Sequence, residues 1–301
     1  MSLKNLIAAT YAPMHKDTSL NLDIIDTYGK FLKKNKVAGA FINGSTGDFA
    51  SLSSIERKLI VEAWSENRPK DLYLINHVGH TSLKEAMDLT LHAADKVDAI
   101  AALAPFYFKI QTVEKLIEYC KSIAFCAPKL PFYYYHIPDL SGAHIKMIDF
   151  IEIASKEIPN FAGLKFTKND LIDFKYCFDF NDNAYDVLFG VDEIFISSLP
   201  LGATGWVGST YNHLAPLYYK VKEAFENNEH KTAADLQTKA MLFVDILNAK
   251  GGFNGVAKGF MKTLGVDCGP SRFPHTTLAD EDYKIILKEL DAIGITSYLS
   301  K

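Results

Sequence analysis

The stretch LPFYYYHIPDLSG (130–142) places three consecutive tyrosines directly before a histidine, an isoleucine and a proline. Aromatic residues favour β-strands, and a proline ends such a run because it cannot donate the next hydrogen bond. Successive side chains of a strand point to opposite faces, so Tyr133 and Tyr135 share one face while Tyr134 points to the other. We therefore expect a strand that ends near His136.

Seven further apolar runs precede or follow this one, and helix-period segments such as 20–36, 54–68 and 112–127 separate several of them. Apolar strands that alternate with helices indicate a parallel sheet covered by helices. Eight strands fit a (β/α)8 TIM barrel; a doubly wound sheet is the alternative, disfavoured because no GxGxxG follows the first strand. The eight runs are NLIAATYAP (5–13), AGAFING (38–44), LYLINHV (72–78), AIAALAP (99–105), LPFYYYHI (130–137), AGLKFT (162–167), DVLFG (186–190) and GATGWVG (202–208).

The strand pattern stops after residue 226. The segments 228–249 and 278–294 have the pattern of helices, and a further helix is predicted around 254–264. We therefore expect an α/β chain with a catalytic barrel over residues 1–226 and a small C-terminal helical appendage over residues 227–301.

Composition gives no electrostatic reason to expect nucleic acid or a membrane surface as a partner, because the net charge is −4 and the basic residues are scattered. The four cysteines form no CxxC pair, which favours reduced thiols in a cytoplasmic protein. The N-terminal apolar run is too short for a signal peptide, and no stretch approaches the ~18 apolar residues of a membrane span.

Chemistry in such a barrel is expected at the carboxyl ends of the strands. In AGLKFT, alternation places Lys165 on the inward face with Gly163 and Thr167, while Leu164 and Phe166 face outward. An amine in this place is costly to bury as an ammonium, and desolvation favours the free amine, a nucleophile towards carbonyls. Lys165 is thus a candidate for forming a Schiff base.

Tyr135 is expected at the inward end of the neighbouring strand, where its phenol could transfer a proton beside Lys165. Tyr133 would lie one layer deeper on the same face and Tyr134 would pack outward. The turn GSTGD (44–48) offers the hydroxyls of Ser45 and Thr46 and several backbone N–H groups, which could receive a carboxylate or could serve only as turn chemistry.

Two other patterns are weaker. His77 and His80 have a metal-like spacing, but no third ligand with matching spacing follows, so no metal site is predicted. GATGWVGS (202–209) resembles a phosphate-binding loop without the lysine of a P-loop, and its glycines could equally serve a tight eighth strand.

The motifs GSTGD, PFYYYHIPDLSG (131–142), GLKFT (163–167), FGVDE (189–193) and GATGWVGSTYN (202–212) occur in an order and at a spacing that resemble one family. This is the family of pyruvate-dependent lysine aldolases that includes dihydrodipicolinate synthases and N-acetylneuraminate lyases. The resemblance is greatest to the N-acetylneuraminate lyase branch. It implies reversible aldol cleavage of a sialic acid to N-acetylmannosamine and pyruvate through a lysine Schiff base, with no metal or organic cofactor.

The resemblance also implies roles for individual residues. Lys165 would form the imine, Tyr135 would transfer the proton, and Tyr107 would support a relay with Ser45. In much of the family this tyrosine comes from a neighbouring subunit, which implies a homotetramer. The residues implied in substrate binding are Thr46, Gly47, Thr167, Gly190, Asp192, Glu193 and Ser209.

Two positions depart from the pattern of some relatives. Leu140 stands where dihydrodipicolinate synthases typically carry an arginine for a second carboxylate, which disfavours that activity. Asp48 stands where many relatives have glutamate. The alternatives left open are a related aldolase for a shorter 2-keto-3-deoxy sugar acid, a zinc aldolase using His77 and His80, and a non-catalytic protein that binds pyruvate or a sugar acid.

Overall fold

The structure is a computed structural model that describes residues 3–301. Its eight parallel strands close into a barrel in which each strand pairs with the next and the eighth pairs with the first. The strands are β1 (Asn5–Ala9), β2 (Gly39–Ile42), β3 (Tyr73–His77), β4 (Ala99–Ala102), β5 (Phe132–His136), β6 (Phe161–Phe166), β7 (Asp186–Phe189) and β8 (Gly205–Gly208). The expectation of a (β/α)8 barrel is confirmed.

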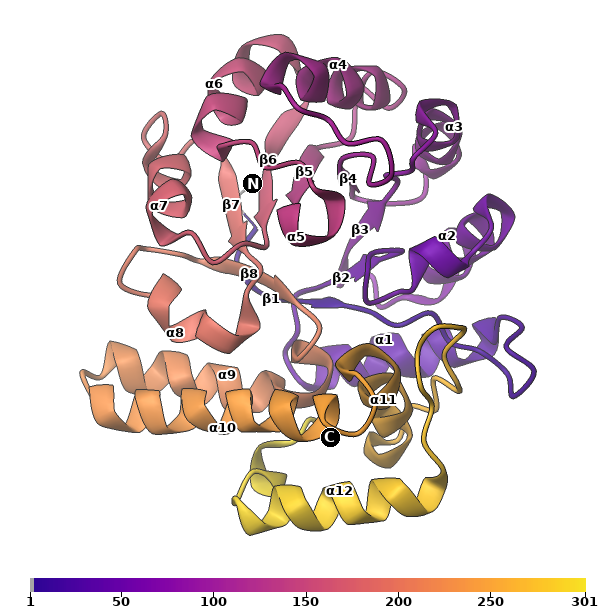
Figure 1. The fold of residues 1–301 in the computed structure, drawn as a ribbon, viewed down its shortest axis with the longest axis vertical. Coiled ribbons are helices and arrows are strands. Elements are labelled where there is room, and N and C mark those ends of the chain that lie inside the picture. Colours follow the sequence, from indigo (N-terminus) through magenta and orange to yellow (C-terminus); the bar gives the residue numbers. More distant parts are fainter. Residues whose placement is uncertain (1–2) are drawn as a thin grey trace.

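Helices surround the strands (Figure 1). Polar side chains start several of them: Ser53 and Glu56 form a capping box at α2, and Thr112 caps α4. The helices are α1 (Ile25–Lys34), α2 (Ser54–Asn67), α3 (Leu83–Ala93), α4 (Val113–Ala124), α5 (Pro138–Ser141), α6 (Met147–Glu157), α7 (Leu171–Asp179), α8 (Phe195–Ser198), α9 (Tyr211–Glu226), α10 (His230–Asn248), α11 (Phe253–Phe260) and α12 (Asp280–Ala292), with 3₁₀ turns η1 (Leu22–Ile24), η2 (Phe49–Ser51), η3 (Asp192–Ile194), η4 (Met261–Leu264) and η5 (Thr296–Tyr298). None of the helices within residues 3–301 is both long enough and apolar enough to span a membrane.

The barrel has two hydrophobic layers, one inside the strands and one between the strands and the helices. Tyr133 and Tyr135 belong to the inner layer, whereas Tyr134, Leu164 and Phe166 belong to the outer one. The alternation of side chains in the sequence predicted both assignments. The register pairs Tyr135 with Lys165, so the two inward residues lie side by side on β5 and β6.

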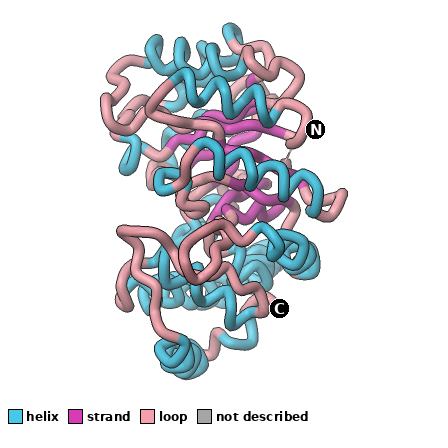
Figure 2. The backbone as a smooth tube through the Cα atoms, turned by 90° about the vertical axis from the view of Figure 1, so that its right-hand side faces the viewer, coloured by secondary structure: helices cyan, strands magenta, loops and turns pink. Residues whose placement is uncertain are grey.

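The C-terminal helices lie together on one side of the barrel, where α10 runs along α9 (Figures 1 and 2). The helix predicted around residues 254–264 is present as α11 followed by η4. The end of the chain returns to the barrel side, since the Ser300 amide donates to the carbonyl oxygen of His213 at 2.7 Å and Lys301 exchanges two hydrogen bonds with Asn35. The C-terminal segment is therefore fastened to the barrel at its last residues.

Candidate active site

Lys165 lies inside the barrel near the carboxyl end of β6 and is 5% exposed. Its Nζ is 3.8 Å from the ring centroid of Tyr135 and 4.3 Å from that of Phe41. Within residues 3–301 no carboxylate forms an ion pair with this nitrogen. An enclosed amine that no carboxylate holds is free to attack a carbonyl carbon, which is the first step of Schiff-base chemistry.

Lys165 opens into a cavity of about 230 Å³. Its lining joins side chains from six strand ends, so the topology gathers residues that are far apart in the sequence. The residues that line it are Ala9, Ser45, Thr46, Tyr135, Ile137, Lys165, Thr167, Gly190, Val191, Asp192, Glu193, Val207, Gly208 and Ser209. All predicted site residues except Gly47 and Tyr107 are among them.

The turn after β2 forms one end of this cavity. The Asp48 amide donates to the Ser45 carbonyl oxygen at 3.0 Å, which closes the turn, and Ser45 Oγ lies 3.5 Å from Tyr135 Oη. Within the described chain, no protein group accepts a hydrogen bond from the amides of Thr46 and Gly47. Backbone N–H groups left free beside two hydroxyls can bind a carboxylate, although Gly47 itself does not line the cavity.

The other end of the cavity carries acceptors. Asp192 is 5% exposed; its Oδ2 accepts hydrogen bonds from the amide and hydroxyl of Thr210 at 3.0 and 2.6 Å, while its Oδ1 has no partner within residues 3–301. Burial, and then the charge of Glu193, raise the pKa of Asp192 to about 6. The Thr167 hydroxyl is also buried without a partner among these residues. These groups are placed to bind hydroxyls.

A glycine is needed where β8 passes Asp192. A Cβ added to Gly208 would lie 1.8 Å from Asp192 Oδ1, so any larger residue would displace the carboxylate. The glycines that the sequence analysis assigned to a tight eighth strand therefore also shape the wall of the cavity.

Tyr107 lies outside the cavity, in the segment that follows β4. Its side chain is 76% exposed and its ring packs edge-on against Phe108, which is 85% exposed. Tyr107 does not line the cavity of Lys165 within the described chain, and the relay expected from a neighbouring subunit stays a prediction.

His77 is fully buried, and both of its ring nitrogens have partners. Nδ1 lies 2.8 Å from the carbonyl oxygen of Asn43, and Nε2 accepts from the Leu103 amide at 3.3 Å. His80 Nδ1 accepts from the Ser82 amide at 2.9 Å. No group of three or more His, Cys, Asp or Glu side chains that could hold a metal ion occurs within residues 3–301.

A second cavity of about 350 Å³ shares Ser45 and Thr46 with the first. Sequence reasoning missed this second cavity, to whose wall the C-terminal segment contributes Asn254 and His275. The signals in the sequence were Leu140 and Asp48, the two positions that depart from the pattern of some relatives, since both line it. The remaining lining residues are Phe49, Ala50, Leu103, Phe106 and Ser141.

Comparison with known proteins finds a matching family model, similar sequences and similar solved structures. The model of the dihydrodipicolinate synthetase family matches residues 2–293, so the chain belongs to that family. Rat N-acetylneuraminate lyase is 40% identical over 277 residues, covering 90% of this chain and 87% of its own.

Solved structures agree. The N-acetylneuraminate lyase of Proteus mirabilis superposes with a TM-score of 0.93 at 36% identity and covers 98% of this chain and 99% of its own. A catalytic lysine mutant of the Ruminococcus gnavus sialic acid aldolase has a TM-score of 0.88 at 29% identity, covering 96% of this chain and 95% of its own.

Proposed function

We propose that the protein is an N-acetylneuraminate lyase, a carbon–carbon lyase that cleaves N-acetylneuraminate reversibly to N-acetylmannosamine and pyruvate. The observation that carries this proposal is the cavity that joins the buried, unpaired Lys165 to the acids Asp192 and Glu193. The amine suits a 2-keto acid, and the two acids suit the hydroxyls of a sugar tail. The similarity to animal and bacterial N-acetylneuraminate lyases supports the same substrate.

In the proposed mechanism, Lys165 attacks C2 of the open-chain 2-keto acid and loses water to form an imine. Tyr135, aided by Ser45, removes the proton from the C4 hydroxyl, directly or through the substrate carboxylate. The C3–C4 bond then breaks, its electrons move into the imine, and N-acetylmannosamine leaves as the aldehyde. The remaining enamine takes a proton at C3, and water hydrolyses the resulting imine to pyruvate and free Lys165.

We assign binding roles by position in the cavity. Ser45, Thr46 and the Gly47 amide would hold the C1 carboxylate, and Thr167 would position the C4 oxygen. Asp192 and Glu193, with Gly190 and Ser209, would bind the polyhydroxy tail. No metal or organic cofactor is required, because the lysine imine itself accepts the electrons.

The assembly and location are proposals that rest on family resemblance. We propose a cytoplasmic homotetramer in which Tyr107 of a second copy completes the relay to Ser45 and Tyr135. The high exposure of Tyr107 supports this arrangement, because a ring outside its own cavity can reach a neighbouring one.

The decisive experiment measures pyruvate release from N-acetylneuraminate with lactate dehydrogenase and NADH, in buffer that contains a chelator. We expect robust turnover in this buffer. Turnover that occurs only when the chelator is left out would favour the zinc aldolase instead. Rates on a six-carbon 2-keto-3-deoxy acid should be much lower; the reverse preference would contradict the proposed substrate. Borohydride with pyruvate should modify Lys165 covalently, which a non-catalytic binding protein would not allow.

A further inference from the structure

Asp48 ends the turn that forms the proposed carboxylate site, yet it lines the second cavity and not the cavity of Lys165. It is 6% exposed and has a left-handed backbone with a φ of 58°. Its Oδ1 accepts a hydrogen bond from Ser51 Oγ at 2.9 Å, and its Oδ2 is buried without a partner among residues 3–301. Aspartate tolerates the left-handed region better than most residues other than glycine.

The surroundings of Asp48 come from the C-terminal segment. His275 Nε2 lies 3.5 Å from Asp48 Oδ1 and 3.4 Å from the amide nitrogen of Asn254. His275 and Asn254 line the second cavity together with Asp48. A turn at the end of β2 is therefore in contact with residues that follow α10.

Lys258 on α11 is a second basic residue of this segment. It is 1% exposed, and its Nζ has no hydrogen-bond partner within the described residues. Burial lowers the pKa of Lys258 to about 8, a shift that the charges of Cys268 and Asp48 partly oppose. Lys258 Nζ and Asp48 Oδ2 are thus both buried without a hydrogen-bond partner within residues 3–301, and the charge of Asp48 acts to raise the pKa of Lys258.

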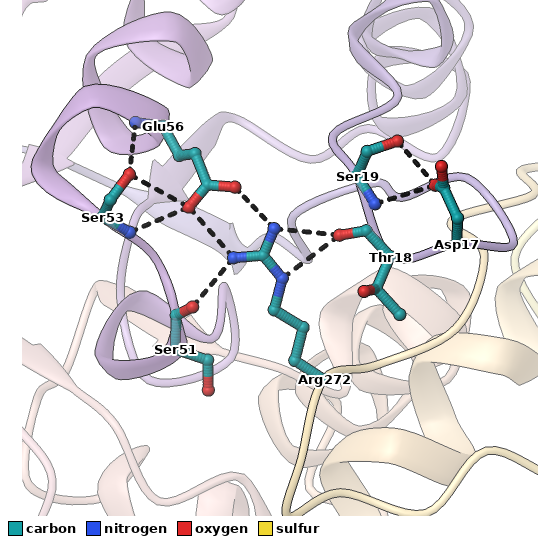
Figure 3. Close-up of polar contacts among 7 residues, drawn as sticks. All are labelled: Asp17, Thr18, Ser19, Ser51, Ser53, Glu56 and Arg272. Carbon is teal, nitrogen blue, oxygen red and sulfur yellow. Dashed lines mark hydrogen bonds and ion pairs between the residues drawn. The ribbon is translucent and has the colours of Figure 1, made fainter.

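Arg272 fastens this segment to the barrel (Figure 3). Its guanidinium donates to the carbonyl oxygen of Thr18 at 2.9 Å and to the carbonyl oxygen of Ser51 at 2.9 Å, and it forms an ion pair with Glu56. Ser51 is also the residue whose hydroxyl binds Asp48. The same short element is therefore held by Arg272 and in turn holds Asp48.

Helix α11 and the segment that carries His275 behave as one packed unit. A Cβ added to Gly255 would come within 2.2 Å of the Thr276 carbonyl oxygen, so the two backbones are in direct contact. Lys258 and His275 consequently lie on two segments that pack directly against each other.

We propose that Lys258 and His275 are positioning residues, which hold Asp48 and thereby fix the turn whose Ser45, Thr46 and Gly47 bind the substrate carboxylate. The inference rests on the proposed function only in assigning a carboxylate to that turn. Its physical basis is geometry and charge: His275 Nε2 lies 3.5 Å from Asp48 Oδ1, and an unbalanced anion at Asp48 would repel a carboxylate bound beside it, a charge that the ammonium of Lys258 offsets.

The test compares Lys258→Met and His275→Gln with Lys262→Met. Lys262 follows on the same stretch of chain but lies at the surface, paired with Asp280, so its replacement is a matched control. For each variant we would measure kcat and KM for N-acetylneuraminate, the half-saturating pyruvate concentration for borohydride trapping, and the melting temperature.

Lys258→Met and His275→Gln should raise KM and the half-saturating pyruvate concentration together, by roughly tenfold for the lysine variant, as expected within one coupled charge network. The kcat should change little, because a carboxylate contact made equally in ground and transition states affects KM alone. Lys262→Met should match the wild type. In Lys258→Met with Asp48→Asn, part of the lost affinity should return, since neither buried charge is left unbalanced.

A lower melting temperature with unchanged pyruvate half-saturation would make both residues merely structural and overturn the proposal. If Lys258→Met does not fold, His275→Gln, which replaces a partly exposed side chain, decides the question. If the wild-type protein traps pyruvate but does not cleave N-acetylneuraminate, the proposed substrate is refuted. The half-saturating pyruvate concentrations of the variants would then still decide this inference. Failure of the folded wild type to trap pyruvate would refute both.

Discussion

At the scale of single residues, the amine of Lys165 is enclosed by the rings of Tyr135 and Phe41 and is not neutralised by a carboxylate. The aromatic faces attract a cation only weakly compared with an ion pair, so they keep the amine in place without preventing it from reacting. The rings thus limit the motion of a buried amine that opens into the cavity, as a nucleophilic lysine requires.

Replacing Lys165 by alanine should abolish essentially all turnover and all borohydride trapping of pyruvate, because no other described amine lines the cavity. Lys168→Ala is the control. Lys168 follows Lys165 by three positions and forms an ion pair with Asp170 near the surface. Coupled pyruvate release and intact-protein mass after trapping would measure both effects. Substantial turnover in Lys165→Ala would contradict the imine mechanism.

Replacing Tyr135 by phenylalanine should reduce kcat by the roughly 10²–10⁴-fold that is typical of a lost acid–base group. Tyr133→Phe is a matched control on the same face of β5, because its hydroxyl donates to Asp186 Oδ2 at 2.8 Å, away from the cavity. The control should lose stability while keeping its kcat. A change of only a few fold in Tyr135→Phe would make its phenol a packing group.

Asp192 should give the activity an acidic limb. Since its pKa is raised to about 6, the carboxyl becomes protonated as the pH falls through that value and loses acceptor capacity for substrate hydroxyls. We expect kcat/KM to decline below about pH 6. Asp192→Asn can still accept from Thr210, and it should lower kcat/KM by about 10- to 100-fold and flatten that limb. An unchanged limb would assign the titration to another group.

Sequence patterns could place some of these residues but not others. Alternation within β5 and β6 sufficed for Lys165, Tyr135 and Tyr133, because neighbours along a strand fix each other's direction. Asp48 could not be interpreted in the same way. His275, which lies 3.5 Å from Asp48 Oδ1, and Lys258, whose pKa the charge of Asp48 acts to raise, are more than 200 positions away in the printed sequence. No local period specifies such an arrangement.

At the scale of elements, the start of α2 links the barrel to the C-terminal segment. Glu56 accepts from the Ser53 amide in the capping box and also pairs with Arg272 (Figure 3). The hydrogen bond from Arg272 is the main reason that the pKa of Glu56 is lowered to about 2. One carboxylate thus stabilises a helix end and a tertiary contact together.

Because this pKa is depressed, the contribution of Glu56 to stability should be complete above about pH 4.5 and should be lost as the pH falls towards 2. Glu56→Gln should therefore lower the free energy of unfolding by about 1 kcal/mol at neutral pH and less at acidic pH. Urea unfolding between pH 3 and 7 would measure this, with the exposed Glu66→Gln as the control. Equal losses at both ends of the range would contradict the assignment.

The sequence predicted the order and type of the main elements more reliably than their ends. Every apolar run contains a strand, but β8 begins only at Gly205 and β1 ends at Ala9, inside longer apolar runs. Residues 10–13 after β1 are buried, which explains why the apolar run continues past that strand, whereas Gly202 and Thr204 before β8 are exposed. The short α5 and the 3₁₀ turns were not predicted, since a single turn has too few residues to show a period.

At the scale of the whole molecule, the division into a barrel over residues 1–226 and an extension over residues 227–301 stays a prediction. The contacts argue that the two parts act together. Arg272 and His275 lie in the extension, yet Arg272 donates to the Ser51 carbonyl oxygen at 2.9 Å and His275 Nε2 lies 3.5 Å from Asp48 Oδ1, close to the end of β2. The extension therefore supplies part of the wall of the second cavity, and its helix α10 packs against α9.

The proposed assembly predicts complementation between two inactive chains. If Tyr107 acts across an interface, a chain with Lys165→Ala still offers an intact Tyr107 to its neighbour, and a chain with Tyr107→Phe still carries an intact Lys165. Co-expression of the two with different tags, followed by sequential affinity purification, would isolate mixed oligomers. These mixed oligomers should be much more active than either parent. The site of the Tyr107→Phe chain keeps its own Lys165 and receives an intact Tyr107 from the Lys165→Ala chain. Mixed oligomers no more active than Tyr107→Phe alone would place the relay within one chain.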